Sequence, residues 1–499
     1  MTAPPPPADP SPRSGIRWRV DLSTPTDGSL ASRGLLSTLG LLFQGGLRFV
    51  TSWLVGRLAG QAALGTVQAA ISTGTLLALL WPTTTGSAAS KYLARARGSG
   101  NEQELHAVAT HLRRRTGVAS LAVAVLAVPA WLLLDDGLLA DAVWVALFAA
   151  AYSGYSFTRG VFFGAGQVRR ATVWDGIGAA LGLAGLAVAL LLGVRGAALI
   201  APIAGAYLVY SIAGWPRGPA VVPSRELGRE LDHMILLGVA GTIASTGFLQ
   251  IAMVVAKGAG SPAEAGQFAA AMVTATPASL LASSLGLVLF PALAQAWGRG
   301  DRETFRVQTD HATRVLVLVM VTIFGSLILM TRLVIHVIWG SEFADSAALF
   351  PILIAAVLTT NLAIASVNAL ITRTHRAMLV TSGASIAGLV VGCISWFFLV
   401  PRDGVMGVAV GYLLGSLVNG LVPLVVEWRT GGHNWTGLAV RLGAGILVIA
   451  SAFTLQRAFD LPWVTDPLVA LGFCLVWWAL SRRDLRLLPA RSTLLGKRP

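Results

Sequence analysis

Residues 55–80 read VGRLAGQAALGTVQAAISTGTLLALL, and residues 255–281 read VAKGAGSPAEAGQFAAAMVTATPASLL. The two stretches align at an offset of 200 with one inserted residue, so that Gly65 corresponds to Gly266. The match continues in the same order past the following predicted helix. Matches that keep their order over about 60 residues indicate an internal duplication, which should be sought before any other feature of a sequence.

The composition excludes most classes of soluble protein. Of the 499 residues, 55% are hydrophobic and 12% are charged, whereas soluble domains carry about 25% charged residues. A soluble enzyme, a disordered protein and a secreted disulfide scaffold are therefore excluded. The two cysteines, Cys393 and Cys474, lie singly within apolar runs, which argues against a disulfide framework or a thiolate metal site.

The apolar runs predict an all-α polytopic membrane protein. A span of about 20 apolar residues crosses a bilayer as a helix, and on this basis the chain divides into fourteen spans between residues 35 and 481. The repeat offset equals six spans, and an even number gives both halves the same orientation. We therefore expect two six-helix bundles related by a parallel repeat, plus two C-terminal helices, with a cleft between the bundles.

The positive charges predict the orientation. With a cytoplasmic N-terminus, 29 of the 37 Lys and Arg residues fall in cytoplasmic segments and 6 in outer loops, as the positive-inside rule requires. Both termini are then cytoplasmic in a cell-membrane protein. The net charge of +14 becomes an orientation signal and a match to anionic lipids of the inner leaflet, so no nucleic-acid partner is expected.

These features predict six segments along the chain. They are a disordered cytoplasmic tail (1–33), an N-terminal six-helix bundle (34–215), a cytoplasmic linker (216–233), a C-terminal six-helix bundle (234–427), two additional helices (428–481) and a basic cytoplasmic tail (482–499).

Arg48 is the first candidate substrate-binding residue. It lies 13 residues into the first span, ~20 Å from the inner end at 1.5 Å per residue, and an arginine at such a depth is expensive. Gln44 lies one turn earlier on the same helix face. The functional interpretation is a polar stripe facing the cleft, with Arg48 binding a substrate pyrophosphate. The alternatives are a structural salt bridge and an arginine that reaches the outer headgroups.

Arg159 and Asp175 form the second candidate site. They lie near the inner ends of the fourth and fifth spans, which are joined by a short turn, so the two side chains could meet. The functional interpretation is a pair at a cytoplasmic gate, in which a diphosphate competes with Asp175 for Arg159. The structural alternative is a fixed ion pair or a contact with lipid headgroups.

Enzyme chemistry has no sequence support here. The histidines show no metal-ligand spacing, and the spans contain no phosphate loop, nucleophile elbow or paired carboxylates. We therefore expect no catalytic residues, no metal site and no cofactor.

Four segments resemble the polysaccharide-biosynthesis flippases of the multidrug/oligosaccharidyl-lipid/polysaccharide exporter superfamily. They are RLAG at 57–60, RGVFFG at 159–164, WGSEF at 339–343 and GVMGVA at 404–409. The resemblance covers residues 34–430 and rests on the order of these segments and the helix count. It implies a flippase that moves a lipid-linked oligosaccharide, a polysaccharide precursor, from the inner to the outer leaflet by alternating access. The implied partners are this substrate, membrane lipids and other polysaccharide-assembly proteins.

Three alternatives stay open at this point. A lipid II flippase fits the helix count and an arginine in the first span. A multidrug exporter coupled to Na⁺ or H⁺ needs buried carboxylates, and Asp175 is the only acid assigned to a span. A non-transporting scaffold of a polysaccharide-assembly complex needs neither buried charges nor a cleft.

Overall fold

The computed structural model describes residues 22, 30–134 and 139–485, and these residues form helices joined by short connections, without a strand. Among them, ten helical segments are long and apolar enough to cross a membrane. Two of these, Gly34–Leu79 and Arg376–Thr430, have 46 and 55 residues, about twice the length of one span. The all-α membrane fold is confirmed, whereas the count of fourteen spans and the segment boundaries stay predictions. Most residues of the two predicted tails lie outside the described residues.

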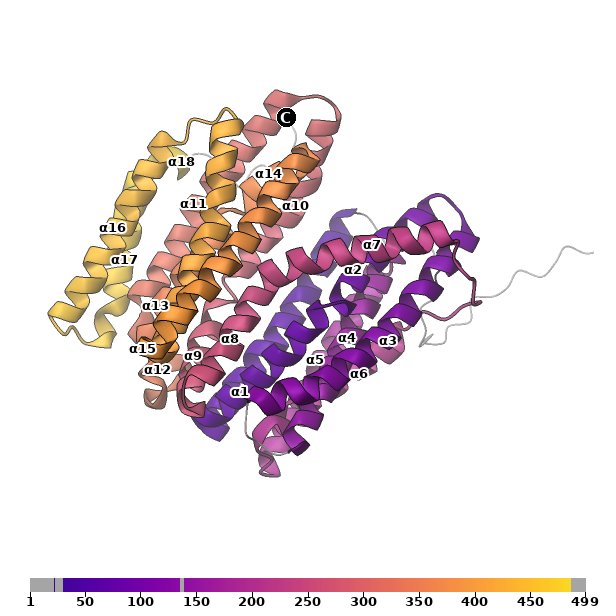
Figure 1. Cartoon of the computed structure of the whole chain (residues 1–499). Coiled ribbons are helices and arrows are strands. Elements are labelled where there is room, and N and C mark those ends of the chain that lie inside the picture. Colours follow the sequence, from indigo (N-terminus) through magenta and orange to yellow (C-terminus); the bar gives the residue numbers. More distant parts are fainter. Residues whose placement is uncertain (1–21, 23–29, 135–138, 486–499) are drawn as a thin grey trace, which may run out of the picture.

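The helices of the first half pack into one bundle, drawn in indigo to magenta in Figure 1. They are α1 (Leu30–Leu79), α2 (Pro82–Gly98), α3 (Glu102–Leu134), α4 (Leu139–Gly164), α5 (Val168–Leu191), the 3₁₀ turn η1 (Gly196–Ile200) and α6 (Ala201–Gly214).

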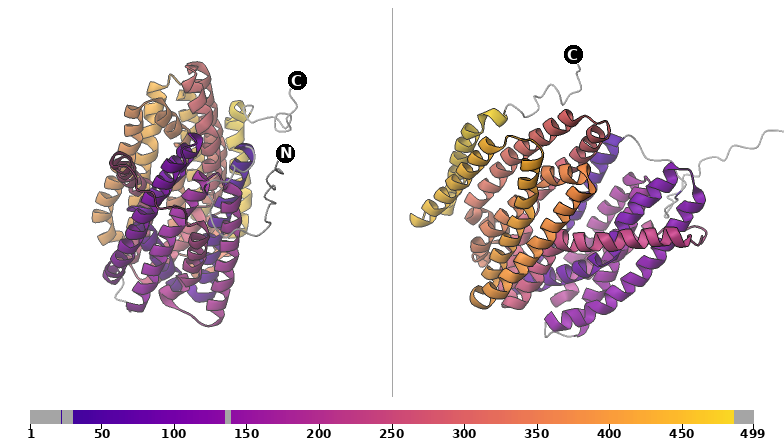
Figure 2. Two further views of the ribbon diagram at one scale, coloured as in Figure 1. Left: turned by 90° about the vertical axis from the view of Figure 1, so that its right-hand side faces the viewer. Right: turned by 45° about the horizontal axis from the view of Figure 1, so that its top comes forward.

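The second half forms another bundle beside the first, and two further helices pack against α11 on its outer side (Figures 1 and 2). The elements are α7 (Arg225–Thr242), the π-helix η2 (Ile243–Gly247), α8 (Phe248–Ala259), α9 (Pro262–Ala275), α10 (Ser279–Gly298), α11 (Arg302–Leu329), α12 (Thr331–Trp339), η3 (Ser341–Phe343), α13 (Ser346–Leu362), α14 (Ile364–Arg373), α15 (His375–Thr430), α16 (Thr436–Ala458), η4 (Trp463–Thr465), α17 (Asp466–Leu480) and α18 (Arg482–Leu485).

Glycine and proline set the breaks in the longest helices. Gly60 in α1 has φ 86° and Gly404 in α15 has φ 53°, values that favour glycine, and each reverses the chain between two antiparallel helices. The sequence predicts a kink at Pro82 within one helix. The structure instead ends α1 at Leu79 and begins α2 at Pro82, a first-turn position that suits proline because the N–H that it lacks would have no helical partner there.

The two bundles meet through residues that the repeat makes equivalent. A Cβ atom added to Gly65 would lie 2.3 Å from the Pro262 carbonyl oxygen and 2.7 Å from the Gly266 nitrogen. A Cβ atom on Gly266 would lie 2.0 Å from the Gln61 carbonyl oxygen. Equivalent glycines of the two halves therefore face each other, which is the contact expected across an axis that relates parallel repeats.

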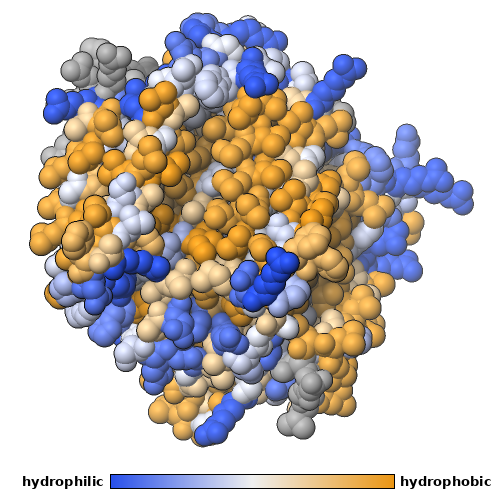
Figure 3. All heavy atoms as spheres, turned by 60° about the vertical axis from the view of Figure 1, so that its left-hand side comes forward, coloured by the Kyte–Doolittle hydropathy of each residue, from blue (hydrophilic) through white to orange (hydrophobic). Residues whose placement is uncertain are grey.

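The molecule has two chemically different ends. We call the end where α1 begins the basic end, because its connections carry arginines such as Arg97, Arg299 and Arg429. The end where α1 turns at Gly60 is called the opposite end. Between them, α16 and α17 expose large apolar side chains such as Leu447 and Leu468, and hydrophobic atoms cover much of the face in Figure 3. Such a surface suits a bilayer core.

The α7 helix crosses from its own bundle to the other one. It begins within the predicted linker, contacts α2, and crosses over the first bundle in Figure 1, whereas α8 packs against α15. Glu230 accepts hydrogen bonds from Tyr92 at 3.0 Å and Arg95 at 3.2 Å. Asp232 pairs with His111 at 2.9 Å and with Arg115. The π-helix η2 joins α7 to α8, and π-helical segments are frequent at functional sites.

Candidate functional site

A cavity of about 410 Å³ lies between the two bundles. Its polar lining residues are Arg48, Ser52, Gln68 and Ser72 of α1, Gln250 of α8 and Thr276 at the end of α9. Apolar residues of both bundles complete it: Leu42, Gly45, Gly46, Phe49, Ile71, Leu249, Met272, Val273, Pro277 and Leu280. The first bundle thus supplies most of the polar wall, and the two bundles contribute equally to the apolar wall. The volume is within the range of small-molecule sites.

Among the described residues that line this cavity, Arg48 alone is charged. Its Nε donates to the Tyr207 hydroxyl at 3.3 Å, and its guanidinium carbon lies 5.0 Å from the centre of the Tyr152 ring. No carboxylate pairs with Arg48 in the part of the chain that the structure describes, and its Nη2 is buried without a hydrogen-bond partner. A partly buried cation without an anion is costly, and a guanidinium in such a setting can bind an anionic group.

Tyrosine rings connect Arg48 to the interior of the first bundle. The Tyr207 ring lies 4.6 Å from that of Tyr155, centroid to centroid. The Tyr155 hydroxyl donates to Asp175 Oδ1 at 2.8 Å. One continuous set of side chains therefore runs from the cavity to the second candidate site.

Arg159 and Asp175 form an ion pair inside this bundle. Arg159 Nε lies 3.5 Å from Asp175 Oδ2, and the Asp175 side chain is only 2% exposed. The pair packs against α1, because a Cβ atom at Gly40 would lie 2.8 Å from Asp175 Oδ2. Thr172 also donates to the Leu36 carbonyl oxygen of α1 at 2.8 Å. The part of α1 before Gly60 thus carries Arg48 and also packs against the Arg159–Asp175 pair.

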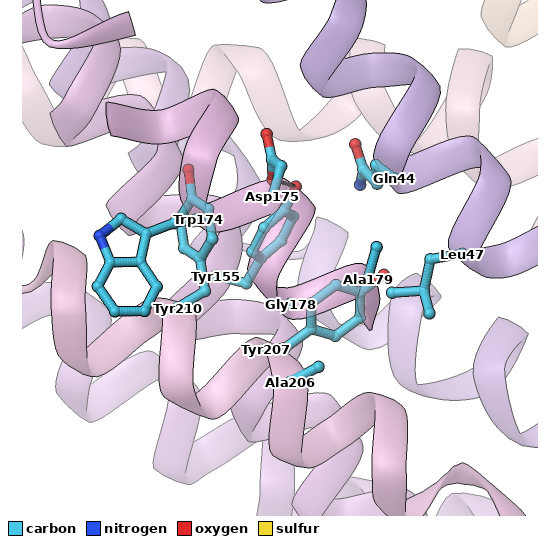
Figure 4. Close-up of a pocket in the computed structure, with 10 residues that line it drawn as sticks. All are labelled: Gln44, Leu47, Tyr155, Trp174, Asp175, Gly178, Ala179, Ala206, Tyr207 and Tyr210. Carbon is cyan, nitrogen blue, oxygen red and sulfur yellow. Dashed lines mark hydrogen bonds between the residues drawn. The ribbon is translucent and has the colours of Figure 1, made fainter. Parts of the chain in front are cut away.

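The structure brings the four predicted residues into one region, but Arg48 and Gln44 line different cavities and Arg159 lines neither. Gln44 does not line the large cavity with Arg48. It lines a second cavity of about 10 Å³, together with Asp175, Tyr155, Tyr207 and Tyr210 (Figure 4). Since helical residues four apart differ by 40° in direction, Gln44 faces α5 and α6 while Arg48 reaches the space between the bundles.

Sequence reasoning missed the tyrosines and the polar residues Gln68 and Ser72. A spacing of three residues from Tyr152 to Tyr155 and from Tyr207 to Tyr210 places each pair on one helix face, and this was the available signal. No group of three or more His, Cys, Asp or Glu side chains that could hold a metal occurs among the described residues.

The fold and the cavity together define a class of protein. Two helical bundles related by a parallel repeat, with a cavity between them, are an architecture of membrane transporters. The family model described as "Polysaccharide biosynthesis protein" matches residues 30–297, more than half of the chain. The chain belongs to this family.

Solved structures share the fold at low sequence identity. An inward-facing multidrug resistance MATE family transporter of the MOP superfamily has a TM-score of 0.64 at 16% identity, covering 79% of this chain and 94% of that one. The lipid II flippase MurJ in an inward closed conformation has a TM-score of 0.61 at 12% identity, covering 91% of this chain and 100% of that one. A MOP superfamily transporter from Pyrococcus furiosus has 0.59 at 17% identity, covering 80% and 95%. No curated protein sequence matches this chain significantly.

Proposed function

We propose that this protein flips a lipid-linked oligosaccharide from the cytoplasmic to the outer leaflet of the cell membrane by alternating access. The unpaired Arg48 in the cavity between the bundles is the observation that carries the proposal. Family membership and the shared fold of a lipid II flippase support it. The basic end is cytoplasmic on the positive-inside rule.

Arg48 binds the phosphate groups that join the lipid to the glycan. Arginine donates parallel hydrogen bonds to phosphate oxygens, and Tyr207 and Tyr152 orient its guanidinium. The hydroxyl and amide groups of Ser52, Gln68 and Ser72 are suited to sugar hydroxyls. The lipid chain stays in the bilayer, so the cavity holds only the head of the substrate. The protein performs no covalent step in this scheme.

The Arg159–Asp175 pair responds to the substrate in the same scheme. Asp175 packs against Gly40 of α1, and its α5 neighbour Thr172 donates to the Leu36 carbonyl oxygen, which connects the pair to the helix that carries Arg48. A phosphate that enters from the basic end competes with Asp175 for Arg159, as expected for a gate that opens on binding.

Binding of a polyprenyl diphosphate to the purified full chain tests this function. We expect Arg48→Ala to weaken binding by about tenfold or more, the effect of losing a hydrogen bond to a charged group, and Arg48→Lys to retain part of the affinity. Arg195→Ala removes an exposed arginine at the opposite end and serves as the control. Equal affinity of Arg48→Ala and the parent chain would remove Arg48 from the substrate site.

A lipid II flippase is the second candidate. The match that spans 91% of this chain and the full length of MurJ favours it, because such coverage extends beyond the twelve helices of the repeat. Growth of cells depleted of their own lipid II flippase distinguishes the two: rescue by this chain supports the peptidoglycan precursor, and failure of a well-expressed chain supports the polysaccharide precursor.

A further inference from the structure

The opposite end of the cavity is closed by contacts that cross between the bundles. Ser52 lines the cavity, and the next residue, Trp53, already contacts the second bundle through a hydrogen bond from its indole Nε1 to the Ile338 carbonyl oxygen at 2.8 Å. On the returning half of α1, Gly65 packs against α9 less than one turn from the cavity residue Gln68. The closure therefore lies directly beyond the cavity.

Arg57 makes the most specific of these contacts. Its Nε donates to the Ile338 carbonyl oxygen at 2.9 Å, and its Nη2 donates to the Val337 carbonyl oxygen at 2.8 Å. These two carbonyl groups belong to the last turn of α12, where a helix has no partners of its own for its carbonyl oxygens. A cation also complements the negative end of the helix dipole. Arg57 of one bundle thus caps a helix of the other.

The chain after α12 is shaped to receive this cap. Gly340 ends the helix with φ 89°, and a Cβ atom there would lie 2.6 Å from Arg57 Nη1. Trp339 is buried, and its indole nitrogen donates to Thr274 Oγ1 at 2.8 Å. Its ring packs against Gly56 of α1, where an added Cβ atom would lie 2.6 Å from the ring. Gln61 of α1 donates to the Glu342 carbonyl oxygen. Gly56 of the first bundle and Gly340 of the second thus permit the close approach of the two bundles.

The internal repeat places a basic residue at the corresponding position of the second half. Lys257 is the equivalent of Arg57 and is 6% exposed, and a Cβ atom on the neighbouring Gly258 would lie 3.7 Å from a Leu134 methyl group at the end of α3. The part of α1 that ends near Arg57 thus lies beside α12 of the second half. In the same way, the end of α8 near Lys257 lies beside the end of α3 of the first half.

We propose that Arg57 is the latch of this closure, so that its withdrawal from the α12 carbonyl groups opens the cavity at the opposite end. The inference rests on the alternating-access scheme proposed above. Helix-end carbonyl groups suit a reversible latch, because water can hydrogen-bond to them once Arg57 leaves. An ion pair would instead leave a carboxylate that keeps attracting the arginine. The release of Arg57 therefore requires no protonation of a carboxylate.

Distances between spin labels at the opposite end test the latch in the full chain. The labels are attached to Leu139→Cys of the first bundle and Asp403→Cys of the second, both exposed, after Cys393 and Cys474 are replaced by alanine. We expect one dominant distance in the parent chain. Arg57→Ala should raise the population of a longer distance by about tenfold or more, since charged donors to two carbonyl groups are lost.

Two further variants keep the test decisive. Gly340→Ala, which removes no charge and forces a side chain against Arg57, should raise the same population even if Arg57→Ala fails to fold. Arg195→Ala, the exposed control at this end, should not. Unchanged distance distributions in both Arg57→Ala and Gly340→Ala would overturn the latch. The experiment needs no glycan, so it is independent of whether the proposed substrate is correct.

Discussion

At the residue scale, the environment of the partly buried Arg48 differs from that of two fully buried carboxylates, Asp466 and Glu427. Asp466 is fully buried and accepts from Arg332 at 2.8 Å and Gln456 at 2.9 Å. Glu427 is also fully buried and pairs with Arg373 and His433. Each of these carboxylates satisfies the rule that buried charges are paired. Arg48 breaks it, and violations of this kind are expected at functional sites.

Tyr207→Phe should weaken diphosphate binding through Arg48. The variant keeps the ring but removes the hydroxyl that accepts from Arg48 Nε at 3.3 Å, so the guanidinium loses its orientation. We expect affinity for a polyprenyl diphosphate to fall by about tenfold. Tyr412→Phe, a buried tyrosine of the second bundle, is the matched control. Equal losses in both variants would show a general effect on packing.

Asp175→Ala should destabilise the first bundle, because it leaves the Arg159 guanidinium without its anion. Loss of one partner of a buried pair costs about 3–5 kcal/mol, and the partial exposure of Arg159 (21%) reduces this figure. Replacing both residues, as in Arg159→Met with Asp175→Leu, should recover much of the stability. Thermal unfolding in detergent measures both. A single variant as stable as the parent chain would contradict a structural contribution of the pair.

At the element scale, close helix contacts depend on single glycines. Gly65 and Gly266 mark the place where α1 and α9 pack without intervening side chains. The sequence could predict that these glycines correspond, because the repeat aligns them. It could not predict that they touch, because the contact depends on how the two bundles are placed.

Gly266→Ala should therefore weaken the closure at the opposite end. Its methyl group would lie 2.0 Å from the Gln61 carbonyl oxygen, and overpacking of this kind costs about 1–3 kcal/mol. We expect a lower melting temperature and a larger open population in the spin-label experiment. Gly98→Ala, which has no atom within 4 Å of the added methyl group, should change neither quantity.

The attachment of α7 to the first bundle is a second element-scale prediction. Glu230→Gln with Asp232→Asn removes carboxylates that bind Arg95, His111 and Arg115. Ion pairs near the surface contribute about 0.2–1 kcal/mol each, so amide hydrogen exchange should accelerate severalfold in Arg225–Thr242. Exchange in α8, which packs against α15, should stay unchanged. Equal protection of α7 in the variant and the parent chain would mean that apolar contacts with α2 hold the helix.

At the scale of the whole molecule, the sequence predicted the class of fold and the more general part of the function. Hydropathy and the repeat were sufficient for two parallel bundles, since each follows from local patterns. The helix ends were less predictable, as at Pro82, where a predicted kink is a break. Arg48, Arg159 and Asp175 could be singled out because charge within a span is rare. Their tyrosine partners carry a weaker signal, the three-residue spacing of Tyr152 and Tyr155 and of Tyr207 and Tyr210.

The last two helices show how the molecule extends beyond its repeat. Trp477 of α17 donates to the Leu318 carbonyl oxygen at 3.1 Å, and Phe473 packs against Gly325, both in α11. Asp484 binds Arg314 at 3.4 Å and Arg441 at 2.7 Å near the basic end. The hairpin is thus fixed to one bundle at several depths, so we expect it to move with that bundle.

Transport by the purified full chain in proteoliposomes tests the central claim most directly. A fluorescent lipid-linked oligosaccharide in the inner leaflet is scored by its accessibility to an enzyme added outside. We predict transfer by the parent chain and the Arg195→Ala control, and a fall of about tenfold or more with Arg48→Ala. Equal transfer by parent and Arg48→Ala vesicles, or none above protein-free vesicles, would contradict the account.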